Sequence, residues 1–116
     1  MVDYDELEAL LMRAACARRS LTYGDVLAYF ERRVTPIMVS ALCKDLGVVC
    51  DRLQARGAPE LACLVVRKSD HLPGEGYFKS CRREGDYDGP SEGPLAEAFL
   101  ARRQEQAFVW ASAHAA

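Results

Sequence analysis

The strongest constraint on the fold is a long apolar stripe that begins just after a threonine–proline pair. Thr35 is a typical helix N-cap, and Pro36 suits the first turn, where its missing amide hydrogen has no partner to lose. Apolar residues recur at helical spacing over 42–53, and Gly57 is placed to end the helix. Gly47 interrupts this pattern and costs about 1 kcal/mol against alanine. We therefore expect it to mark a kink or a close helix contact.

Two shorter helical patterns precede this one. The first covers residues 3–18 and carries an apolar stripe with acids at its start, which suits the positive end of the helix dipole. The second begins at Thr22, with Asp25 three residues later as in a capping box, and its apolar face ends at Phe30. Three helices in the first 57 residues therefore form the predicted centre of the fold.

The pattern changes after Pro59. Residues 61–66 form a short apolar run bounded by turn signals, which predicts a buried strand. A glycine-bearing loop over 71–76 follows, and Tyr77 and Phe78 are predicted to form a second strand, which would make a β-hairpin. Two glycines around Glu75 would shape the turn between the strands.

This order predicts an α+β, mostly helical fold: a winged helix-turn-helix-like three-helix core with a short β-hairpin and a C-terminal helix. We expect one domain over 1–116, which is long enough to bury a core. It would comprise a winged-helix-like core over 1–83, an acidic Gly/Pro loop over 84–94 and a C-terminal helix over 94–113. The same order of elements also fits a three-helix core with a hairpin that does not bind DNA.

Charge is unevenly distributed along the chain. The net charge is −2, but residues 9–83 hold thirteen Lys and Arg against seven Asp and Glu. A basic middle between acidic ends permits an anionic partner for the middle alone. The coding bias of a GC-rich gene is the alternative explanation for the many arginines. No segment resembles a signal peptide or a membrane span, so we expect a cytoplasmic protein with no membrane partner.

The sequence offers no clear catalytic or metal-binding motif, so we predict a non-catalytic protein with no cofactor and no metal. Asp70 with His71, and Glu60 with Lys68, are weak candidates for acid–base or nuclease chemistry. The five cysteines lack CxxC spacing and a secretory context, so we expect no disulfide framework and at least four buried thiols. Cys63 lies inside the apolar run and is predicted to be a core residue.

Two binding functions remain open. In the first, the third helix and the hairpin bind nucleic acid. The predicted DNA contacts are polar and cationic side chains on those elements. These residues are Ser40, Lys44, Arg52, Arg67, Lys68, Lys79, Arg82 and Arg83. In the second, the same fold is an adaptor subunit or homodimer that binds a protein partner. A continuous positive face would favour the first function, and an exposed apolar patch the second.

One segment resembles a known family. Residues 21–26 (LTYGDV) resemble the opening of the DNA-binding domain of the alkylguanine-DNA alkyltransferases and alkyltransferase-like proteins. The likeness extends over about 20–78, through Pro59, the Val65–Val66 pair and the Leu-Pro-Gly turn at 72–74. It implies a winged helix that uses its third helix against DNA. The family's reactive Pro-Cys-His-Arg-Val motif is absent, and Cys63 stands one place off the reactive position, so the resemblance does not imply alkyl transfer.

Overall fold

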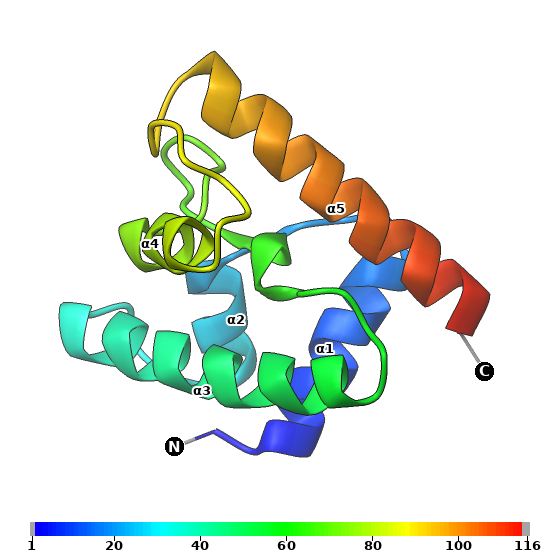
Figure 1. Cartoon of the computed structure of the whole chain (residues 1–116). Coiled ribbons are helices and arrows are strands. Elements are labelled where there is room, and N and C mark those ends of the chain that lie inside the picture. The colour runs from blue at the N-terminus through cyan, green and yellow to red at the C-terminus, as the bar shows by residue number, and fades with distance from the viewer. Residues whose placement is uncertain (1, 115–116) are drawn as a thin grey trace.

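The structure is a computed structural model that describes residues 2–114. Figure 1 shows the arrangement of its helices, with α5 running past α1 and with α4 beside the first half of α3. The elements, in chain order, are α1 (Tyr4–Cys16), β1 (Leu21–Thr22), α2 (Tyr23–Tyr29), α3 (Pro36–Ala55), the 3-10 helix η1 (Ala62–Leu64), β2 (Val65–Val66), α4 (Glu75–Arg83) and α5 (Pro94–His114). The chain is therefore mostly helical with one very small sheet, an α+β composition as predicted.

Side-chain caps begin the first three helices. Asp3 accepts hydrogen bonds from the amides of Asp5 and Glu6 at the start of α1. Thr22 and Asp25 form the predicted capping box of α2, and the Thr35 hydroxyl accepts the amide of Met38 at 3.1 Å. Each cap satisfies an amide that has no partner within the helix. The predicted starts of all three helices are confirmed.

The predicted strand over 61–66 is correct only at its end. Residues 62–64 form η1, and only Val65 and Val66 are extended. They pair in parallel with Leu21 and Thr22, a two-residue strand that the sequence analysis did not predict. A parallel pair needs a long crossover between its strands, and here α2 and α3 supply it.

The predicted β-hairpin is wrong. Tyr77 and Phe78 belong to helix α4, and the described residues contain no strand after β2. Phe78 and Cys81 are spaced three apart, so a helix presents both on one face, where they pack with Ala96 and Phe99 of α5. Glu75 in the first turn and Arg83 in the last complement the helix dipole. Two adjacent apolar residues fit the spacing of a strand as well as that of a helix. Here packing against α5 favours the helix.

The larger hydrophobic core joins α1, α2, α3, the η1–β2 segment and α5 from Leu100 onward. The smaller core beneath α4 extends into the loop before α5, where Tyr87 stacks on Phe99 with ring centroids 4.4 Å apart. The predicted C-terminal helix is confirmed as α5, and residues 84–93 form neither helix nor strand. Within residues 2–114, no helix is both long and apolar enough to cross a bilayer.

Candidate functional site: a cleft between α3 and α4

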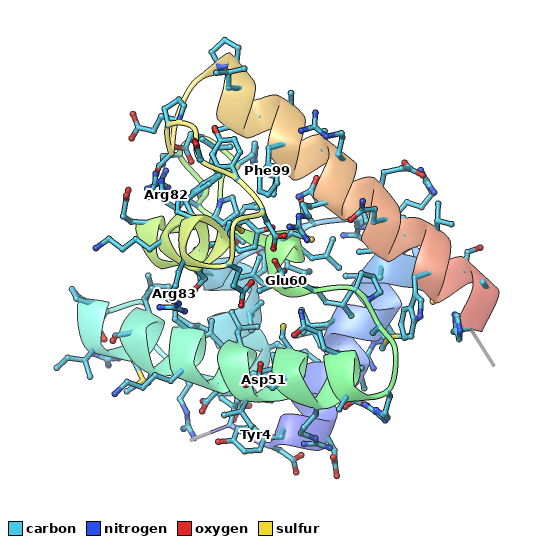
Figure 2. All side chains as sticks on the ribbon, in the orientation of Figure 1. Tyr4, Asp51, Glu60, Arg82, Arg83 and Phe99 are labelled. Carbon is cyan, nitrogen blue, oxygen red and sulfur yellow. The ribbon has the colours of Figure 1, made fainter. Side chains whose placement is uncertain are left out.

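A cleft of about 560 Å³ lies between α3 and α4. Polar and cysteine side chains of α3 form one wall, and one face of α4, from Gly76 to Arg83, forms the other. Glu60, which comes just before η1, lies between them (Figure 2). A cleft of this size is large enough for a small organic molecule or for an inserted side chain.

A long-range hydrogen bond fixes the start of α4 beside α2. The amide of Gly74 donates to the Tyr23 hydroxyl at 3.1 Å. Burial raises the pKa of Tyr23, and the Gly74 amide partly opposes that effect. This bond links the Thr-Tyr-Gly and Leu-Pro-Gly segments, which are distant in sequence. Together with the pairing of β1 and β2, it sets the distance between α4 and the body of the protein.

Glu60 is a largely buried acid in the cleft. One carboxylate oxygen accepts the amide of Cys63 at 2.8 Å. Burial raises the pKa of Glu60, while the Cys63 amide and the positive charge of Arg103 act in the opposite direction. Arg103 is itself paired with Asp86 at 2.9 Å. The carboxyl of Glu60 therefore has no ion-pair partner within 2–114.

The hydroxyl of Tyr77 is buried beside Glu60. It is close enough to the carboxyl for each group to shift the pKa of the other. The geometry of this contact is nevertheless not that of a normal hydrogen bond. Burial and the neighbouring acid both raise the pKa of Tyr77. A buried hydroxyl is normally hydrogen-bonded, and the neighbouring carboxyl of Glu60 is the group positioned to accept from it.

The structure brings together only some of the predicted binding residues. Ser40 and Lys44 of α3 and Arg83 of α4 line the cleft. Figure 2 shows Arg83 extending from α4 toward α3. Ser40, Lys44 and Arg83 form the polar edge of the cleft, which we call the α3–α4 rim, and Lys79 is exposed on α4 outside the cleft lining.

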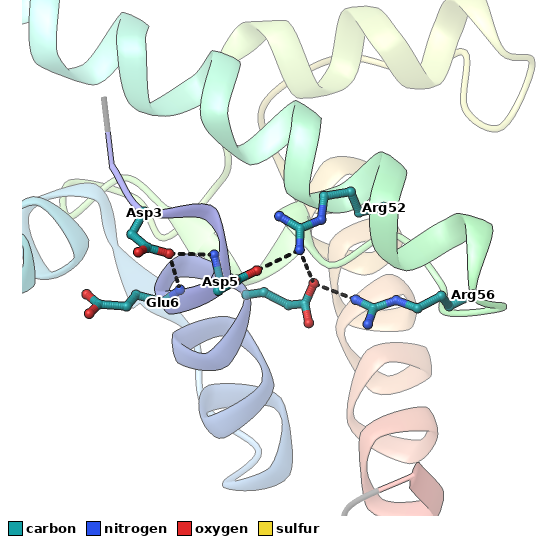
Figure 3. A network of polar contacts seen from close by, with 6 residues as sticks. Asp3, Asp5, Glu6, Arg52 and Arg56 are labelled. Carbon is teal, nitrogen blue, oxygen red and sulfur yellow. Dashed lines mark hydrogen bonds and ion pairs between the residues drawn. The ribbon is translucent and has the colours of Figure 1, made fainter.

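The other predicted cations lie elsewhere or are already paired. Arg52 of α3 binds Asp5 at 2.7 Å and is 3.8 Å from Glu8, both on α1 (Figure 3). The hydrogen bond to Asp5 raises the pKa of Arg52. Arg67 pairs with Asp70 at 2.8 Å.

The last two predicted residues also lie off the rim. Arg82 contacts Glu75 and the loop carbonyl of Gly89. Lys68 is exposed in the loop before α4.

Sequence reasoning missed the residues that shape the cleft. Tyr23, Tyr77 and Arg103 come from three distant segments, so no local spacing predicts their approach. Gly47 does interrupt the predicted helix, but the close helix contact offered as one explanation is not made. A Cβ at this position would meet nothing within 4 Å, because Gly47 faces the open cleft.

The cysteines divide by location. Cys50, Cys63 and Cys81 are buried, whereas Cys16 and Cys43 are exposed, so the expectation of at least four buried thiols is wrong. Cys43 is exposed because it lines the cleft rather than the core. Burial raises the pKa of Cys50 to about 12 and also raises that of Cys63. No group of three or more His, Cys, Asp or Glu residues within 2–114 is positioned to hold a metal ion.

Comparison with protein-family models, with curated proteins and with solved structures found no match.

Proposed function

We propose that the protein is a helix-turn-helix-like nucleic-acid-binding protein that contacts its ligand through the α3–α4 rim. The observation that carries this proposal is the convergence of Ser40, Lys44 and Arg83 on one cleft edge, from two different helices. Lys44 and Lys79 are exposed and form no ion pair with any residue of 2–114. Exposed cations without an ion-pair partner suit phosphate contacts.

The architectural part of the proposal is a three-helix unit of α1, α2 and α3, in which α4 occupies the position expected for the wing. Support comes from the capping box at Thr22 and from the contact between the Thr-Tyr-Gly and Leu-Pro-Gly segments. These are the segments that resemble the DNA-binding domain of the alkyltransferase family. Cys63 is fully buried and its pKa is raised by burial, so the proposal includes no alkyl transfer.

Salt-dependent binding to a short fluorescent duplex and to its single strand tests the proposal. Binding should weaken as salt rises, because phosphate contacts release counterions. Lys44→Ala and Arg83→Ala should each reduce the slope of log affinity against log salt by about one unit. Arg56→Ala is the matched control, since Arg56 pairs with Glu8 away from the cleft. No binding at low salt, or an equal effect of Arg56→Ala, would contradict the proposal.

A second candidate function rests on the turn between α2 and α3. Tyr29, Val34 and Ile37 are 47%, 65% and 76% exposed there. Large apolar side chains gathered at one corner are typical of a protein interface, and a homodimer is the simplest form. Sedimentation of the parent chain and of Ile37→Ser distinguishes this function. A parent dimer that the substitution dissociates would favour it, and a monomeric parent at all concentrations would exclude the homodimer.

A further inference from the structure

Two large apolar side chains project into solvent at the start of α3. Ile37 is 76% exposed in the first turn of the helix, and Val34, just before the helix, is 65% exposed. The Thr35 hydroxyl caps this turn through the amide of Met38. The Cγ2 of Val34 lies 3.7 Å from the place that a Cβ on Gly24 of α2 would take. The two exposed side chains therefore belong to a capped helix and a packed turn.

The exposed face of α3 continues beyond Ile37 with polar and apolar residues. Lys44 and Val48 follow at seven and eleven residues, a spacing that places all three on one side of a helix. Both are exposed, whereas Leu42 is buried on the other side of α3. Ser40 lies between this face and the cleft. The first half of α3 thus presents apolar, hydroxyl and cationic groups along one outer face.

Positive charge flanks the two exposed apolar side chains. Arg33 precedes Val34 and is exposed, and Lys44 lies about two turns beyond Ile37. Neither cation forms an ion pair within the described part of the chain. Among residues 31–44, Lys and Arg outnumber Asp and Glu by three to one. A partner for this face should therefore carry negative charge on both sides of an apolar group.

The major groove of B-form DNA fits this face in shape and in chemistry. An α-helix with its side chains is about 10–12 Å across, and the major groove is about 12 Å wide. In Figure 1 the first turns of α3, drawn in cyan, extend past α1 and α2 to one end of the molecule. Among the four bases, only thymine presents a methyl group in that groove. Side chains cannot read the deep, narrow major groove of A-form RNA, so duplex RNA does not fit.

We propose that Ile37, together with Val34, reads thymine in duplex DNA by contacting its C5-methyl group in the major groove. Arg33 and Lys44 contact phosphates on either side, without sequence preference. An apolar protein surface would leave both cations without counter-charges, whereas the DNA backbone supplies them. This inference rests on the proposed function, and it adds a class of ligand and a residue that sets specificity.

Short hairpin duplexes test the inference by changing only methyl groups. One contains alternating A·T pairs, and in its partner deoxyuridine replaces every thymidine. We expect the parent protein to bind the thymine duplex roughly fourfold more tightly for each methyl group that it buries. A G·C duplex with 5-methylcytosine should bind more tightly than its unmethylated form, because this methyl group lies in the same groove. Fluorescence anisotropy at low salt measures each affinity.

Variants separate the reading of bases from the binding of phosphates. Ile37→Ser should abolish the preference for thymine while leaving the affinity for the deoxyuridine duplex and the salt dependence nearly unchanged. Ile37→Val keeps a smaller apolar contact and should retain part of the preference. Lys44→Ala should weaken binding to both duplexes and reduce the salt slope by about one unit, with the preference intact. Val109→Ser, at an exposed apolar position of α5, is the matched control.

The outcomes distinguish failure of this inference from failure of the proposed function. Absence of salt-dependent binding to either duplex would overturn both. Equal affinities for the thymine and deoxyuridine duplexes, or a preference that survives Ile37→Ser, would overturn the inference alone. An equal preference for oligo(dT) over oligo(dU) would place the contact outside a groove and also overturn it. A dimer that Ile37→Ser dissociates, with the preference intact, would assign Ile37 to a protein interface instead.

Discussion

The Tyr23 hydroxyl accepts the amide of Gly74 at 3.1 Å, across 51 residues of sequence. Tyr23 is the first residue of α2, and Gly74 caps α4. This hydrogen bond therefore connects the three-helix unit to the helix that forms the outer wall of the cleft. It also gives Tyr23 a structural role that its position after a capping threonine does not reveal.

Removal of this hydrogen bond should destabilise the protein. We expect Tyr23→Phe to lower the free energy of unfolding by about 1 kcal/mol, because the Gly74 amide loses its partner. Denaturant unfolding followed by circular dichroism measures the change. Tyr29→Phe is the control, since the Tyr29 hydroxyl accepts a hydrogen bond from Arg13 at the surface. Equal stability of Tyr23→Phe and the parent would show that water replaces the bond.

The cap of α3 gives a second stability test. Thr35→Ala should cost about 1 kcal/mol, because the Met38 amide loses its acceptor. Thr35→Ser keeps the hydroxyl and should retain most of the stability. Thermal unfolding compares the three proteins. A serine variant as unstable as the alanine variant would assign the effect to the threonine methyl group instead.

Glu60 should make stability fall as pH rises. Burial raises its pKa in the folded state, so between the unfolded and folded pKa values the folded protein binds more protons than the unfolded one. The free energy of unfolding then decreases with pH through this window and stays lower above it. Glu60→Gln should remove this component and stabilise the protein at neutral pH. Parallel pH profiles of the parent and the variant would contradict the assignment.

Two glycines in or near α3 should respond in opposite directions. Gly47→Ala should stabilise the protein by roughly 0.5–1 kcal/mol, because the helix gains propensity and the new Cβ enters open space. Gly57 has a φ of +93°, which alanine adopts only with strain, so Gly57→Ala should destabilise. Urea midpoints measure both changes. Destabilisation by Gly47→Ala would mean that the cleft is narrower at Gly47 than described.

Thiol labelling tests the location of the cysteines. In the native protein, Cys16 and Cys43 should react quickly with an excess of a maleimide, while Cys50, Cys63 and Cys81 stay protected until unfolding. Peptide mass spectrometry identifies each labelled site. Incubation with DNA that contains alkylated guanine should likewise leave Cys63 unmodified. Fast labelling of Cys63 would contradict its burial.

The parts of the fold that the sequence predicts correctly are those set by local chemistry. Thr22 and Thr35 cap helices through amides three residues away, and Gly57 ends α3 where a positive φ is needed. Tyr77 and Phe78 could not be assigned in the same way, because two adjacent apolar residues define no period. Their helix depends on packing against Phe99, which lies in another element.

The candidate site was predicted only in part for the same reason. Charge and polarity alone point to Ser40, Lys44 and Arg83, and these residues do meet at one cleft. Charge points equally to Arg52, but its location depends on α1, whose acids bind it. Glu60 appeared only as a weak nuclease candidate, since its burial beside Tyr77 arises from contacts between distant segments.

The packing of α5 on α1 has a consequence for biosynthesis. The Cys16 thiol reaches the carbonyl of Ala111, 95 residues later, and Arg18 pairs with Glu105. During translation, α1 therefore leaves the ribosome long before the helix that covers one of its faces. Until α5 is made, that face is exposed to chaperones and to neighbouring nascent chains. Substitutions that weaken α5 should therefore lower the yield of folded protein in cells more than they lower its stability once folded.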